Sequence, residues 1–247
     1  TFYKGSWARP ITLLEPASNM ALIATAASGL VGASDLFSVE LDEGAHILRA
    51  IWGANGSVTP PFTNVPNGQN ASFLLSPAPY CYIQGVETNG SFAAGNLGST
   101  AFTYIWSNVT TTGILQVAYA EQCGSQHGTP FPWLAGYGFT NNMNAAELLL
   151  GSNGLPIWQS YIAALNPTNI SSRFELSRCT PGNGANIVLT FDSATGRIYS
   201  VLYAPSPAQA TWAASLTSNV QGTGGAISIP DAASATSRYY QLKVELP

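Results

Sequence analysis

The sequence predicts a mainly β protein in which two antiparallel, sandwich-like β-domains are joined by a short helix-loop-helix segment. Three observations lead to this fold class. Short apolar or alternating runs recur between clusters of Gly, Pro and Asn in both halves of the chain. Asn-Gly turn signals, such as Asn55-Gly56 and Asn89-Gly90, separate several of these runs. Helical apolar spacing occurs only between residues 132 and 171.

The N-terminal β-domain is predicted to span residues 1–125. Its runs predict strands at 11–14, 21–26, 37–41, 46–52, 71–75, 80–86, 101–106 and 114–120. In the last run Leu115, Val117 and Tyr119 fall on one face, because side chains alternate along a strand.

Residues 126–171 are predicted to form the helical linker. A short helix is expected at Asn144–Leu150, and Pro156 suits the first turn of a second helix. Trp158, Ile162 and Leu165 follow at helical spacing, and Asn166-Pro167 is expected to end that helix.

The C-terminal sandwich-like domain is predicted to span residues 172–247. Its expected strands lie at 174–177, 186–191, 197–203, 212–216, 226–229 and 238–246. The last run is the clearest, because Tyr240, Leu242, Val244 and Leu246 alternate with Gln241, Lys243 and Glu245.

The chain is unusually poor in charge. Only 8% of its residues are charged, against about 25% in typical soluble domains. A surface made of Ser, Thr, Asn, Gln and Gly hydrates well but gives little repulsion between copies. This composition favours a subunit of a fibre, sheath or surface layer, and it also suits an ordinary secreted β-protein.

Charge and hydropathy also exclude some partners. Two lysines, Lys4 and Lys243, and a net charge of −4 provide no basic patch for a phosphate backbone, so no nucleic-acid partner is predicted. No apolar run approaches the roughly 20 residues that span a bilayer. The start at Thr1 without Met is interpreted as processing after export, which predicts an extracellular or cell-surface location.

Two modifications are candidates. Three cysteines allow one disulfide, and Cys123 with Cys179 is the preferred pair, because Cys81 lies inside an apolar run; three reduced thiols are the alternative. Asn-x-Ser/Thr triplets are possible glycosylation sites at Asn55, Asn70, Asn89, Asn108 and Asn169, although a chain rich in Asn, Ser and Thr also produces such triplets by chance.

The sequence offers no grouping of catalytic residues, so no enzyme activity and no cofactor are predicted. His46 and His127 are isolated, and both are expected to have structural roles. No pair among the acidic residues is marked by its spacing as a glycosidase pair. Trp7, Trp106, Trp133 and Trp212 are candidates for a sugar-stacking platform or, alternatively, for core or interface positions.

Three stretches resemble modules of large secreted bacterial proteins, particularly of the Verrucomicrobia and Planctomycetes. Residues 46–121, with Ile51–Pro60, Ala71–Phe73 and Tyr80–Val86, are similar to the "bacterial repeat" β-module related to internalin B-repeats. Residues 212–247 resemble the closing β-module of such proteins. The resemblance implies a surface-exposed spacer or adhesion role without catalysis.

The stretch from Trp133 to Asn169 resembles a helical linker with a calcium loop of dockerin or thrombospondin type-3 style. Such a loop needs oxygen ligands at its first, third, fifth and twelfth positions. Aligned on Gly154, these positions hold Leu149, Gly151, Asn153 and Ser160, without a carboxylate. We therefore predict that no metal is bound, and that Leu149, Trp158 and Ile162 stabilise the linker by apolar packing.

Together these observations predict an extracellular structural protein that assembles with copies of itself into a bacterial surface filament or layer. An assembly strand is expected near the N-terminus, at Phe2, Trp7, Ile11 and Leu13. The alternative is a carbohydrate-binding or adhesion module with surface glycans as partners. A hydrolase is the last of the three hypotheses.

Overall fold

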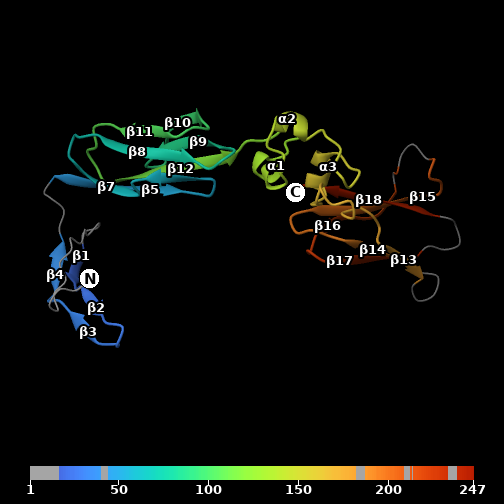
Figure 1. The fold of residues 1–247 in the computed structure, drawn as a ribbon, viewed down its shortest axis with the longest axis horizontal. Coiled ribbons are helices and arrows are strands. Elements are labelled where there is room, and N and C mark those ends of the chain that lie inside the picture. Colours follow the sequence, from blue (N-terminus) through green and yellow to red (C-terminus); the bar gives the residue numbers. More distant parts are fainter. Residues whose placement is uncertain (1–16, 40–43, 182–186, 209–211, 213, 233–237) are drawn as a thin grey trace. The chain divides into compact units, whose positions relative to one another are not determined.

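The computed structural model describes residues 17–39, 44–181, 187–208, 212, 214–232 and 238–247. The chain divides into two compact units, unit 1 at Thr1–Gln122 and unit 2 at Cys123–Pro247. Both units consist mainly of antiparallel strands (Figure 1). The predicted mainly β fold class is confirmed. The predicted segments 126–171 and 172–247 both belong to unit 2.

The first described part of unit 1 contains two short antiparallel strand pairs. β1 (Ala17–Met20) pairs with β4 (Phe37–Val39), and β2 (Ile23–Thr25) pairs with β3 (Val31–Ala33). The predicted runs at 21–26 and 37–41 contain β2 and β4. The run at 11–14 lies outside the described residues.

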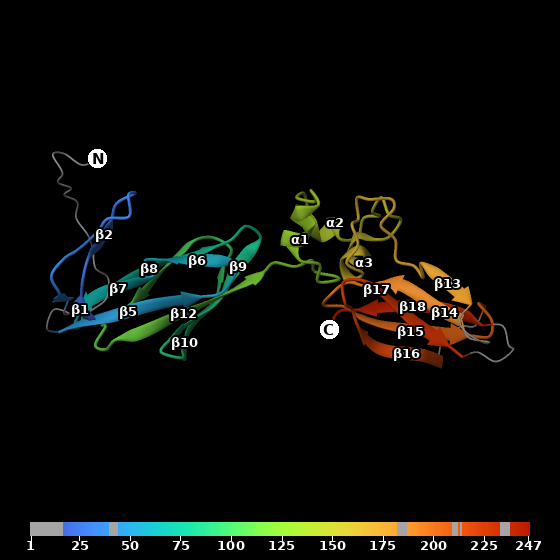
Figure 2. The same cartoon turned by 90° about the horizontal axis from the view of Figure 1, so that it is seen from below.

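The rest of unit 1 contains a five-stranded sheet, ordered β10-β9-β12-β5-β7, and a three-stranded sheet, ordered β11-β8-β6 (Figures 1 and 2). The strands are β5 (Ala45–Trp52), β6 (Gly56–Thr59), β7 (Phe62–Pro66), β8 (Ala71–Pro77), β9 (Cys81–Thr88), β10 (Ser91–Gly98), β11 (Phe102–Trp106) and β12 (Gly113–Glu121). The runs predicted at 46–52, 71–75, 80–86, 101–106 and 114–120 match β5, β8, β9, β11 and β12.

One strand pair departs from the antiparallel prediction. β12 pairs with β5 in parallel, with Leu115 opposite Ala50, while its other neighbour β9 is antiparallel. The first and last strands of the sandwich are thereby joined at the centre of the five-stranded sheet. A parallel pair needs a long crossover, and here the intervening strands provide it.

The core of unit 1 comes from the alternating inner faces of the two sheets. Leu48, Phe73, Leu75, Ile83 and Leu115 have no exposed surface. They belong to one cluster, against which partly buried aromatic side chains also pack.

Tyr119 is partly buried and packs against this core. Its hydroxyl donates a hydrogen bond to the carbonyl of Ser57, at 2.6 Å. A Cβ on Gly56 would lie 2.5 Å from the Tyr119 ring, so this close approach requires glycine.

Unit 2 begins with helices α1 (Phe131–Gly136), α2 (Met143–Ala146) and α3 (Ile157–Ile162). The helix predicted at 144–150 ends at Ala146, and α1 was not predicted. Asn142 caps α2, because its side chain accepts a hydrogen bond from the Ala145 N–H. Pro156 is the N-cap of α3, one residue before the position predicted for it.

The strands of unit 2 form two three-stranded sheets. Their orders are β13-β14-β17 and β16-β15-β18. The strands are β13 (Arg178–Pro181), β14 (Ile187–Asp192), β15 (Ile198–Ala204), β16 (Ala214–Gln221), β17 (Ala226–Asp231) and β18 (Tyr239–Glu245). Leu189, Phe191, Tyr199 and Val201 are the buried centre of their core.

Most strand predictions for unit 2 are confirmed, including the alternation of β18 between half-buried and exposed residues. The strand predicted at 174–177 is wrong, because those residues form no strand and β13 begins at Arg178. Phe174 and Leu176 are nevertheless half-buried between exposed neighbours, because both pack on the core from an irregular segment.

Arg197 connects the strands of unit 2 to its helices. Its Nε donates to the carbonyl of Ile162 at 2.6 Å, and its Nη2 donates to the carbonyl of Tyr161 at 2.8 Å. The guanidinium also lies 5.4 Å from the centre of the Tyr161 ring. These contacts satisfy carbonyls at the C-terminal end of α3, where a cation is favoured.

Replacing Arg197 by Lys is therefore expected to lower the free energy of unfolding of unit 2 by about 1.5–3 kcal/mol, because an ammonium cannot reproduce the planar two-point contact. Urea denaturation measures this change. Arg173 is exposed, and Arg173→Lys serves as the matched control. Equal stability of the two variants would show that the Arg197 contacts are unimportant.

Candidate functional site

The sandwich of unit 1 is nearly free of charge. Residues 45–122 contain Arg49, Glu87 and Glu121, with His46 as the only other titrating base. The long runs between these three residues hold no Asp, Glu, Lys or Arg. Contacts between two such surfaces desolvate few ions, which removes a main obstacle to association.

The four edge strands of this sandwich differ in how they are protected against pairing with a strand of another chain. Natural edges are commonly blocked by bulges, prolines, short length or charge. β10 has two register shifts against β9. β7 is preceded by Pro61 and ends at Pro66, and the four-residue β6 is followed by Pro60.

β11 has no bulge, no proline and no charge to block its edge. Its five residues, Phe102–Trp106, pair with β8 in unbroken register and include no proline, glycine or charge. Among the described residues no strand pairs with its other side. We call this strand and its unpaired side the β11 edge. Its side chains have high β-propensity, which makes it suited to accept another strand.

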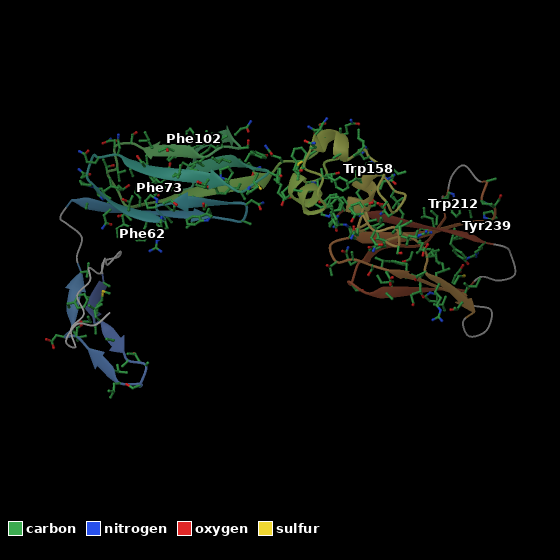
Figure 3. All side chains as sticks on the ribbon, viewed as in Figure 1. Phe62, Phe73, Phe102, Trp158, Trp212 and Tyr239 are labelled. Atoms are coloured by element: carbon green, nitrogen blue, oxygen red, sulfur yellow. The ribbon has the colours of Figure 1, made fainter. Side chains whose placement is uncertain are left out.

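The side chains of the β11 edge alternate between two faces. Tyr104 and Trp106 pack against the unit 1 core, whereas Ile105 is 54% exposed on the outer face. Phe102, which is labelled in Figure 3, is also exposed, with 38% of its surface accessible. The strand therefore presents an exposed ring and an exposed aliphatic side chain beside backbone groups that can form hydrogen bonds.

Unit 2 contains a buried carboxylate that sequence reasoning did not single out. Glu147 has no exposed surface. Its oxygens accept hydrogen bonds from the backbone N–H groups of Gln126 at 3.0 Å and of His127 and Thr129 at 3.3 Å. A Cβ on Gly124 would lie 2.2 Å from Oε2 of Glu147, so the loop can wrap the carboxylate only with glycine there.

The protonation of Glu147 follows from this surrounding loop. Burial favours the neutral acid, but hydrogen bonds from the backbone N–H groups of Gln126, Thr129 and His127 favour the charged form. The net result is a pKa below the ordinary value. The carboxylate thus holds the 124–129 loop against α2, where Asn144 also accepts a hydrogen bond from Ser125 N–H at 3.0 Å.

The loop that resembles a calcium loop in sequence is closed by direct hydrogen bonds. Asn153 Nδ2 donates to Ser160 Oγ at 3.0 Å, and Asn153 Oδ1 accepts from Leu155 N–H at 3.2 Å. Asn153 and Ser160 thus bond to each other at the fifth and twelfth loop positions. Within the described residues no three His, Cys, Asp or Glu side chains lie together as metal ligands.

The predicted role of Leu149 in packing is wrong. Its side chain is 54% exposed, because α2 ends before it, and Ile157 is the fully buried residue at this point. Trp158 and Ile162 are half-buried. Trp158 stacks on His127 with ring centres 4.0 Å apart.

Calcium is expected to leave the thermal unfolding midpoint of the protein unchanged, and a chelator is expected to have no effect. The physical reason is that no carboxylate occupies a ligand position of the loop, and the one side-chain amide oxygen at such a position, that of Asn153, already accepts a hydrogen bond. Differential scanning calorimetry with and without millimolar calcium measures this. A midpoint that rises with calcium concentration would contradict the prediction.

A small apolar cavity lies within unit 2, between α3, the Phe174 segment and β18. Its volume is about 290 Å³, and its lining includes Trp158, Ile162, Leu242 and Val244. Gln159 and Lys243 provide polar groups at the cavity. It can hold a small, largely apolar group or one face of a sugar ring.

A buried polar cluster joins the two sheets of unit 2. Asp231, on β17, accepts from Arg238 at 2.8 Å and from the Tyr240 hydroxyl at 2.8 Å. Arg238 also lies 4.3 Å from the centre of the Tyr203 ring. Burial and the hydrogen bond to Asp231 raise the pKa of Tyr240 to about 12. The cluster links β17 to β18 on the opposite sheet through Tyr240 and gives the buried Asp231 carboxylate its hydrogen-bond donors.

The predicted cysteine pair is not formed in the structure. Cys123 and Cys179 are exposed, Cys81 is buried, and no disulfide joins any of them. The backbone of Cys123 instead forms a bridge with Pro130.

Asparagine conformation offers another explanation for the predicted glycosylation triplets. Asn55, Asn89 and Asn108 have positive φ angles, which asparagine adopts more readily than most residues. The side-chain oxygens of Asn70, Asn89 and Asn169 accept backbone hydrogen bonds. Positive φ angles or hydrogen bonds to backbone N–H groups thus give all five asparagines structural roles, and glycosylation stays a prediction.

The remaining predicted residues fall in different places. The assembly-strand residues Phe2, Trp7, Ile11 and Leu13 lie outside the described residues. Trp106, Trp133 and Trp212 are half-buried, and Trp133 contacts Tyr137 and Tyr161 edge-on. His46 bonds with Asn67, at 3.0 Å. Within the part of the chain that the structure describes, no helix is long and apolar enough to cross a bilayer.

Comparisons with known proteins give no assignment. No protein-family model, curated protein or solved structure matches the chain. The resemblance to secreted bacterial modules therefore stays a prediction.

Proposed function

We propose that the chain is a structural, non-catalytic segment of an extracellular or cell-surface protein, and that it associates with copies of itself in a filament or layer. The observation that carries the proposal is the nearly ion-free sandwich of unit 1 with its unprotected β11 edge. An open strand edge is a template for another chain, and an uncharged surface allows close approach.

Electron microscopy of the negatively stained, purified protein at increasing concentration tests this proposal. Ordered oligomers, filaments or sheets are expected. Dispersed single particles at every concentration would contradict self-association. The bacterial surface location is tested separately, by detecting the protein outside intact cells of its source.

A second candidate function is glycan binding. Trp158 supports it, because this indole borders the unit 2 cavity beside Gln159 and is held in place by the His127 ring. Sugar rings stack on such indoles. A glycan array tests this candidate: binding that is lost on Trp158→Ala but kept on Trp52→Ala, an exposed indole in unit 1, would support it. An array without any binding would leave self-association as the only candidate.

A further inference from the structure

We propose that the β11 edge pairs antiparallel with the β11 edge of a second copy, with Tyr104 opposite Tyr104 on the two-fold axis. This inference rests on the proposed function and names the contact through which two copies meet. A two-fold contact uses the same surface on both chains. The sequence of β11 is suited to such self-pairing.

The register that places Tyr104 on the axis matches the side chains of the strand. Phe102 then lies opposite Trp106 of the second copy, and Thr103 lies opposite Ile105. The aromatic pairs fall on the core-facing side, where Tyr104 and Trp106 already pack. Pairs of aromatic residues and pairs of β-branched residues stabilise antiparallel strands.

The pairing also covers the exposed side chains and the unpaired backbone groups of the β11 edge. The 38% exposed ring of Phe102 gains an indole neighbour, and the 54% exposed Ile105 gains a β-branched one. Backbone groups on the unpaired side gain hydrogen-bond partners. The two three-stranded sheets, each ordered β11-β8-β6, become one continuous sheet across the two copies.

The lack of charge around β11 and its regular pairing with β8 favour a second copy as the partner of the β11 edge. Residues 88–120 contain no Asp, Glu, Lys or Arg, so the approach of two identical edges brings no like charges together. The unbroken register with β8 keeps the strand straight enough to pair along its length. One such contact closes a dimer, and a filament then needs a second contact elsewhere on the chain.

Disulfide cross-linking tests the register. In a background carrying Cys123→Ser and Cys179→Ser, the variants Thr103→Cys and Ile105→Cys are mixed and oxidised. A covalent heterodimer is expected in the mixture, because opposite side chains lie about 4.5–5.5 Å apart at Cβ. The matched control is a mixture of Leu74→Cys and Ser72→Cys, which lie beside Thr103 and Ile105 on the inner strand β8. This control is expected to give no heterodimer.

The outcomes separate the two proposals. The register would be overturned if the Thr103→Cys variant alone formed a covalent dimer as readily as its mixture with Ile105→Cys does. Ile105→Lys is expected to raise the dimer dissociation constant at least about tenfold, whereas Leu74→Lys, exposed on the same face, is expected to leave it nearly unchanged. Equal weakening by both, or no change with Ile105→Lys, would overturn the β11 contact while self-association stands. Wild-type protein that stays monomeric would overturn both proposals.

Discussion

Replacing Glu147 by Ala is expected to lower the free energy of unfolding of unit 2 by about 3–5 kcal/mol, because three backbone N–H groups lose their charged acceptor and one of them, that of the buried Thr129, is left without a partner. These donors belong to Gln126, His127 and Thr129. Glu147→Gln is expected to cause a smaller loss, since it keeps one carbonyl oxygen. Urea denaturation of the variants measures both changes.

Glu175→Ala is the matched control for charge. Glu175 is exposed, and its removal is expected to change stability by no more than about 0.5 kcal/mol. A Glu147→Ala protein as stable as this control would show that the 124–129 loop does not depend on the buried carboxylate.

The stabilisation from Glu147 is also expected to depend on pH. Its folded-state pKa lies below the ordinary value of 4.5, so the stabilisation is fully present above that value and is lost as pH falls through the folded-state pKa. The stability difference between wild type and Glu147→Gln should therefore shrink in acid. A difference that stays constant from neutral to strongly acid pH would contradict the assigned protonation.

Replacing Phe73 by Ala is expected to lower the free energy of unfolding of unit 1 by about 3–5 kcal/mol, because the ring lies fully buried between the two sheets. Unit 2 is expected to keep its own stability, since its core is a separate cluster around Phe191 and Tyr199. Hydrogen exchange followed by mass spectrometry reports the two units separately.

Phe92 provides the control for Phe73, because it is the same residue type and is 75% exposed on β10. Phe92→Ala is expected to have little effect on unit 1. If Phe73→Ala weakened unit 2 as much as unit 1, the two cores would be coupled, and the description of two separate units would be wrong.

The strands that the sequence predicted well are those with clean alternation. Residues 114–120 and 238–246 each show one apolar face, and both correspond to strands. β10 was missed because its run, with Gly95 and Asn96, contains the residues that mark turns. The parallel pairing of β5 with β12 could not be read from local patterns, because it joins residues more than sixty positions apart.

The candidate sites were less predictable than the fold. Glu147 is the only acidic residue between Glu121 and Glu175 and stands between Ala-Ala and Leu-Leu-Leu. This isolation was a usable signal for a buried carboxylate, although its partners are backbone groups that no sequence motif identifies. The β11 run was predicted as a strand, but only the sheet order shows that it lies at an edge.

Sedimentation velocity of the full chain, over a wide range of protein concentration and at low and high salt, tests self-association most directly. The sedimentation coefficient is expected to rise with concentration, and to the same extent at both salt levels, because uncharged surfaces are not subject to ionic screening. A single monomer boundary at all concentrations would contradict the proposed function. Association that disappears at high salt would contradict an uncharged contact.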